Sequence, residues 1–153
     1  MRRGFTLLEV AVVLTIGGLL IGLTGAAFGD FVRRNAARRA AELFAQDLTA
    51  ARSYAVRSRE RVVIRFFESG LWYHVQTQAT GTEIARRRFG GSADIDLSGV
   101  DLDMTGDSVV FSARGIADLS GASGALGEAS FSSGASSYTV SFNGMGASKI
   151  EQS

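Results

Sequence analysis

The first sixty residues carry a helical pattern of apolar positions in two parts. Residues 5–29 are almost entirely apolar, and residues 10–29 form an uncharged run of 20. As a helix, such a run spans about 30 Å, the thickness of the hydrocarbon core of a bilayer. The pattern therefore predicts a transmembrane helix segment over 5–29. Beyond it, apolar residues recur every three or four positions, which predicts an amphipathic continuation over 30–60 with the helix ending near Ser58. Its apolar face comprises Phe28, Val32, Ala36, Ala40, Leu43, Phe44, Leu48, Ala51 and Ala55.

Strand-like periodicity begins at residue 61. The first three apolar runs are separated by short glycine-containing connections, which is typical of an antiparallel β-meander. Residues 115–137 hold 17 Gly, Ala or Ser among 23 positions, which favours a long loop. The sequence therefore predicts an α+β fold, with one long N-terminal helix packed on an antiparallel β-sheet domain over 61–153. The expected strands are 61–67, 71–78, 82–89, 100–104, 108–113, 129–133 and 138–143.

Composition narrows the possible functions. The 153 residues include no cysteine and a single histidine, His74. A disulfide framework, a thiolate metal site and a cysteine nucleophile are therefore excluded, and most zinc and acid–base sites lack their residues. The sequence has no G-x-S-x-G element and no glycine-rich phosphate loop. We expect no enzymatic activity, no cofactor and no metal.

The charges are divided between the two parts of the chain. Residues 1–91 hold 14 arginines against seven acids, whereas residues 92–153 hold two basic residues against eight acids. Such a division favours a chain that meets different surroundings at its two ends, or one that docks head to tail with copies and relatives.

Three groups of polar residues remain as candidate sites. His74 follows Trp72 and Tyr73 directly and is expected to be an ordinary strand residue. Five aspartates alternate with apolar residues and could supply oxygen ligands to calcium, but solvent-facing strand residues explain them more simply. Arg86, Arg87 and Arg88 form a basic cluster that suits a solvated strand face or a docking patch for an acidic neighbour; with Arg114 it could hold phosphates. The aspartates are Asp94, Asp96, Asp101, Asp103 and Asp107.

Glu9 is the one carboxylate near the start of the apolar segment. Thr6 and Glu9 have the spacing of a capping box, and an acid in the first turn complements the helix dipole. Alternatively, the Glu9 carboxylate forms an ion pair with a cation at the same depth, such as a free α-amine, because a carboxylate in hydrocarbon needs compensation.

Residues 3–10 (RGFTLLEV) resemble the processing site of type IV prepilins and type II secretion pseudopilins. The resemblance rests on a short basic leader ending in glycine, then phenylalanine, an apolar run, and glutamate fifth after the cut. It implies that prepilin peptidase removes the leader, residues 1–4, by cleaving between Gly4 and Phe5, and then N-methylates Phe5. It also implies that Glu9 acts in assembly, by neutralising the terminal amine of an adjacent subunit.

The rest of the chain resembles the H-type minor pseudopilins of type II secretion and the minor pilins of the fimbrial T class. The supporting segments are 50–56 (AARSYAV), 109–115 (VVFSARG) and 140–146 (VSFNGMG). The resemblance implies a structural subunit of the secretion pseudopilus, a hetero-oligomeric fibre that takes part in protein export across the outer membrane. Its partners would be the major pseudopilin and other minor pseudopilins.

The same resemblance implies a single-pass protein of the bacterial inner membrane with its C-terminal domain in the periplasm. The basic residues argue for the opposite orientation, because four arginines follow the apolar segment closely and two precede it. The alternative function is a fimbrial T class minor pilin of a type IV pilus that binds DNA for uptake. In that class the DNA-binding arginines lie in the C-terminal segment, where this chain offers only Lys149, so nucleic acid is not an expected partner.

Overall fold

The computed structural model describes residues 6–91 and 93–153, and for residues 23–27 it describes only the helical backbone. The chain divides into two compact units, one ending at Val32 and the other comprising Arg33–Ser153. Helix α1 (Leu7–Ser58) has 52 residues and contributes to both units. Its end at Ser58 confirms the prediction from the sequence, and Arg59 follows with a left-handed φ of 58°.

The first turn of α1 has the cap that its sequence predicts. The Thr6 Oγ1 atom accepts a hydrogen bond from the backbone N–H of Glu9 at 3.2 Å, which satisfies one of the free donors of the helix start. In the part of the chain that the structure describes, no helix has both the length and the apolar character needed to cross a membrane, whereas the sequence pattern predicts a span over 5–29.

The second unit contains two antiparallel sheets. The five-stranded sheet has the order β3-β2-β1-β5-β6, and the four-stranded sheet has the order β4-β7-β8-β9. The predicted meander is confirmed, because β1 pairs with β2 and β2 with β3. The strands are β1 (Val62–Phe67), β2 (Trp72–Thr77), β3 (Glu83–Arg88), β4 (Gly99–Asp103), β5 (Ser108–Phe111), β6 (Ala117–Asp118), β7 (Gly127–Ser133), β8 (Ser136–Phe142) and β9 (Ser148–Gln152), with a 3-10 turn, η1 (Glu68–Gly70), between β1 and β2.

The predicted loop over 115–137 is wrong in extent. It contains β6, β7 and the start of β8. The expected strand over 129–133 is confirmed as part of β7, and β9 is an additional strand that the sequence did not predict. Along β7, Ala129, Phe131 and Ser133 are buried while Glu128 is exposed, which is the alternation of a half-buried strand. Small side chains hide this alternation in the sequence, because Gly, Ala and Ser suit either face.

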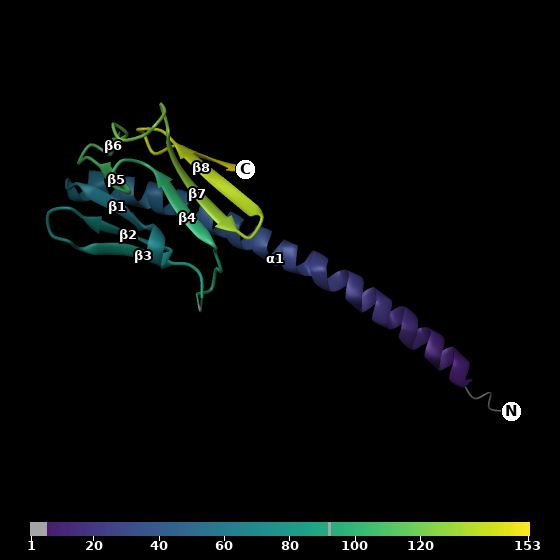
Figure 1. The fold of residues 1–153 in the computed structure, drawn as a ribbon. Coiled ribbons are helices and arrows are strands. Elements are labelled where there is room, and N and C mark those ends of the chain that lie inside the picture. The colour runs from purple at the N-terminus through teal and green to yellow at the C-terminus, as the bar shows by residue number, and fades with distance from the viewer. Residues whose placement is uncertain (1–5, 92) are drawn as a thin grey trace. The chain divides into compact units, whose positions relative to one another are not determined.

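One face of the C-terminal part of α1 packs against both sheets (Figure 1). The ring of Phe44 is fully buried and lies 5.3 Å from Phe66, 5.6 Å from Tyr73 and 5.6 Å from Phe131, measured between ring centroids. These partners come from both sheets, so Phe44 joins them. Around it α1 presents small side chains, which let the strands approach closely; they are Ala37, Ala40, Ala41, Ala51 and Ala55, all fully buried. Phe28 and Val32, expected on this face, are 68% and 50% exposed instead.

We predict that Phe44→Ala lowers the free energy of unfolding by about 3–5 kcal/mol, because a large buried ring leaves a cavity between the two sheets. Phe31→Ala is the matched control: Phe31 is 61% exposed, so its loss should cost less than about 1 kcal/mol. Urea unfolding of the full chain in detergent, followed by the fluorescence of Trp72, measures both. Equal midpoints for the two variants would show that Phe44 does not join the sheets.

Candidate functional site

The N-terminal residues of the predicted processing site are only partly described. Gly4 and Phe5 lie outside the described residues. Glu9 is exposed in the first turn of α1, and its backbone N–H makes the capping bond to Thr6. The cap uses the backbone of Glu9, so it is compatible with an assembly role for the carboxylate.

The first turns of α1 expose an apolar surface on every side. At about 100° per residue, the exposed positions are distributed around the whole helix circumference. A helix that is apolar all round needs cover from lipid or from other helices. The side chains are at least 48% exposed, and they are Leu7, Leu8, Val10, Val12, Val13, Leu14, Ile16, Leu19, Leu20 and Ile21.

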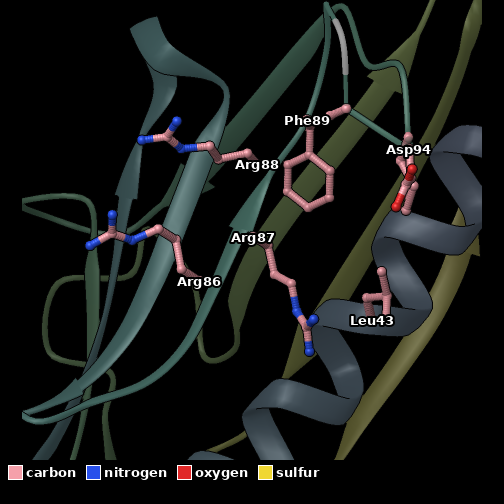
Figure 2. A pocket seen from close by; sticks show the side chains of 8 residues that line it. Leu43, Arg86, Arg87, Arg88, Phe89 and Asp94 are labelled. Atoms are coloured by element: carbon pink, nitrogen blue, oxygen red, sulfur yellow. The ribbon is translucent and has the colours of Figure 1, made fainter.

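The basic cluster expected at 86–88 is divided between two faces of the sheet. Side chains alternate along a strand, so Arg86 and Arg88 of β3 point to one side and Arg87 points to the other, toward α1 (Figure 2). The three arginines therefore do not form one patch. Arg114, in the turn between β5 and β6, belongs to the opposite edge of the five-stranded sheet and does not complete a phosphate site with them.

Arg87 makes a two-pronged ion pair with Asp47 of α1. The Arg87 Nε and Nη2 atoms donate to Asp47 Oδ2 and Oδ1 at 2.9 Å and 3.0 Å, and the Tyr73 hydroxyl donates to Asp47 Oδ2 at 2.8 Å. The Asp47 side chain is only 7% exposed. The hydrogen bonds to Asp47 raise the pKa of the Arg87 guanidinium, and burial, followed by the charge of Asp47, raises the pKa of the Tyr73 hydroxyl. Both groups keep their protons, and together they attach edge strand β3 to the helix.

Sequence reasoning missed Asp47 and Tyr73. The available signal was the position of Asp47 three residues after Phe44, within the apolar face of α1, where an unpaired carboxylate would be costly. An open cleft of about 350 Å³ lies beside this ion pair, with Leu43, Arg87, Phe89 and Asp94 in its lining (Figure 2). The arrangement attaches β3 to α1.

The outer side of β1, β2 and β3 gathers arginines around aromatic rings. The rings of Phe67 and Trp72 stack at 3.9 Å between centroids, and the Arg86 guanidinium lies 5.4 Å from the Trp72 ring. His74 is the middle residue of this face, and its Nε2 atom is buried without a hydrogen-bond partner among the described residues. Burial and the charges of Arg65 and Arg86 lower its pKa. His74 is thus a strand residue, as expected, but its neighbours are cationic.

The five aspartates considered for calcium come from different elements of the fold. Asp101 and Asp103 lie on β4, whereas Asp107 precedes β5 in the other sheet. Among residues 6–91 and 93–153, no three histidine, aspartate or glutamate side chains are grouped to hold a metal ion. Burial and the neighbouring Asp101 and Asp107 raise the pKa of the Glu68 carboxyl.

Comparison with known protein families assigns most of the chain to one family. The family model described as type II transport protein GspH matches residues 40–146. The chain belongs to the GspH family. A second model, the prokaryotic N-terminal methylation motif, matches residues 1–25 and supports the resemblance to prepilins. No curated protein matches the chain significantly.

Among solved structures, this GspH-family chain is similar to the type IV minor pilin FimU of Pseudomonas aeruginosa PAO1. One crystal form is 19% identical, with 79% of this chain and 92% of FimU covered and a TM-score of 0.58. A second crystal form gives 16% identity, coverage of 74% and 91%, and a TM-score of 0.54. At these identities the likeness shows the fold: a helix packed on antiparallel sheets, as in pilins.

We predict that Arg87→Ala destabilises the GspH-family domain by about 2–3 kcal/mol, because it leaves the Asp47 carboxylate buried with only the Tyr73 hydroxyl as partner. This value lies below the range of about 3–5 kcal/mol expected for a fully buried pair, because the Arg87 side chain is 39% exposed and partly screened by solvent. Arg86→Ala, on the opposite side of the same strand, should cost less than about 1 kcal/mol.

Urea unfolding of the full chain in detergent distinguishes the two arginines. The triple variant Asp47→Leu/Tyr73→Phe/Arg87→Met removes every polar member at once and should recover most of the lost stability. If Arg87→Ala and Arg86→Ala have the same midpoint, the ion pair does not attach β3 to the helix.

Proposed function

We propose that this protein is a minor pseudopilin, a structural subunit of the type II secretion pseudopilus that takes part in protein export across the outer membrane. The observation that carries the proposal is the apolar surface around the first turns of α1, directly after a prepilin-type N-terminus. Such a surface needs lipid around it before assembly and other helices around it within a fibre. Membership of the GspH family supports the choice of secretion machine.

The proposed path of the protein begins in the inner membrane. Prepilin peptidase cleaves between Gly4 and Phe5 and N-methylates Phe5, and the domain that follows the helix lies in the periplasm. The helix then leaves the lipid and packs against the helices of the major pseudopilin and of other minor pseudopilins. The protein works mechanically, without chemical turnover.

Glu9 sets the register of this helix packing. Its carboxylate pairs with the terminal amine of an adjacent subunit, which neutralises both charges in an apolar setting. A shift of the helix would leave the carboxylate unpaired, and an unpaired charge in hydrocarbon is costly. Glu9 is exposed at the start of α1, where a neighbouring chain can reach it.

A type IV pilus minor pilin is the second candidate function, and the fold of FimU favours it. DNA binding for uptake would belong to this alternative. Restoration of secretion, rather than of pili, in a strain that lacks the corresponding subunit distinguishes the two machines.

We predict that co-expression with an active prepilin peptidase removes residues 1–4 and adds one methyl group, measured as the intact mass of the full-length protein. The control is the same strain with an inactive peptidase. An uncut chain, under conditions in which a known pseudopilin is cut, would reduce the N-terminal segment to a capped helix without a processing role.

We further predict that Glu9→Ala is processed normally but enters fibres at a strongly reduced level. Glu42→Ala is the matched control, because Glu42 is another glutamate of α1, is half-buried and pairs with Arg38 within the same helix. Fibre incorporation is measured by immunoblotting of sheared fibres. Equal incorporation of the two variants would reject the ion-pair role of Glu9.

A further inference from the structure

The outer face of the five-stranded sheet is basic over β1, β2 and β3. The strand register places two rows of side chains across this face: Arg88, Trp72 and Phe67 in one, and Arg86, His74, Arg65 and Ser108 in the other. Arg86 pairs with Glu83 of its own strand. Three arginines against one glutamate give this arginine face, defined by Arg65, Phe67, Trp72, His74, Glu83, Arg86 and Arg88, a formal charge of +2.

The outer face of the four-stranded sheet is acidic and rich in hydroxyl groups. One row consists of Asp101, Ser130, Thr139 and Glu151, and the next consists of Asp103, Glu128, Ser141 and Lys149. Four carboxylates against one lysine give this acidic face, defined by these eight residues, a formal charge of −3. Lys149 already pairs with Glu151 of its own strand.

Each face gathers charges of mostly one sign, and on the acidic face two like charges are directly opposed. Asp103 and Glu128 are direct cross-strand partners on the acidic face. On the arginine face, His74 lies between Arg65 and Arg86, and no described residue accepts a hydrogen bond from its Nε2 atom. Like charges at directly opposed positions destabilise a sheet. A surface of the opposite charge would relieve this repulsion, and the same chain presents one on its other sheet.

We propose that the arginine face of one copy of this chain docks on the acidic face of a second copy. The contact is heterologous, because the two surfaces differ, so a docked pair leaves one arginine face and one acidic face available for further copies. The contact pairs the three arginines of one face with the carboxylates of Asp101, Glu128 and Glu151. The hydroxyl groups of Ser130 and Thr139 then lie against the aromatic rings of the arginine face. In this contact the basic part of one chain, residues 1–91, binds the acidic part of another, residues 92–153.

This contact is small and depends on salt. Four strands about 4.8 Å apart and five residues long give a face of roughly 220 Å², well below the approximately 800 Å² per partner of a standard interface. Exposed charges are screened beyond about 10 Å at 0.1 M salt. The docking therefore adds to other contacts, such as helix packing, and needs a trapping method to be seen alone.

The absence of cysteine makes disulfide trapping selective. Ser108→Cys lies on a row of the arginine face, and Ser130→Cys lies on a row of the acidic face. In detergent-solubilised full-length protein at low salt, each variant alone should give little disulfide dimer, since like faces repel. An equimolar mixture should give a heterodimer at least fivefold above either variant alone.

Charge reversal tests the pairing itself. Arg65→Glu/Arg88→Glu in the Ser108→Cys chain should abolish the heterodimer, as should Asp101→Lys/Glu128→Lys in the Ser130→Cys chain. Combining the two reversed chains should restore it, and circular dichroism verifies that each variant is folded. The control is Ser53→Cys, an exposed position of α1, mixed with Ser130→Cys, which measures random collisions within micelles.

Three results would overturn the proposal: a Ser108→Cys homodimer as strong as the mixture, a heterodimer that persists at 0.5 M NaCl, or no restoration on double reversal. Retention of a duplex DNA fragment that is lost on Arg65→Glu/Arg88→Glu, without any heterodimer, would assign the arginine face to nucleic acid instead. None of these results depends on peptidase processing or on secretion, so failure here leaves the proposed function standing, and failure of that function leaves this contact testable.

Discussion

The burial of one face of α1 against two separate sheets is the constraint on which the rest of the structure depends. The two sheets do not form one continuous ladder, since β1 and β5 belong to one and β4 and β7 to the other. Phe44 touches rings from both, and the alanines around it set how closely the strands approach. Since a cavity at such a position costs several kcal/mol, the helix serves as the common core of the domain.

The Asp47–Arg87 ion pair fixes the position of one edge strand on the helix. It ties β3, an edge strand with only one neighbour in the sheet, to the C-terminal part of the helix. By turning Arg87 inward it also fixes Arg86 and Arg88 on the outer side, beside Trp72. The ion pair that anchors the strand therefore decides which arginines remain available to a partner.

Two kinds of surface remain uncovered, and they suit different contacts. Covering the apolar first turns of α1 with lipid or with other helices removes their side chains from water, which is favourable. These contacts are therefore strong and little affected by salt. Ion pairs between the charged faces of the two sheets contribute little to affinity in water, and they mostly select the partner and its orientation. A pilin-like subunit can use the first for cohesion and the second for choosing its neighbours.

The sequence by itself determined the helix, its cap, its end at Ser58 and the first meander, because these depend on contacts between residues near one another in the chain. It did not determine β6 or where β7 and β8 begin, since small residues such as Ala117, Gly127 and Ser136 carry no clear preference for either face, and it did not predict β9. The sequence also could not show that Arg87 points to one side of the sheet while Arg86 and Arg88 point to the other. The direction of Arg87 depends on the register of β3 against β2 and on a carboxylate 40 positions away. Only the tertiary structure, which brings distant residues into contact, decided those features.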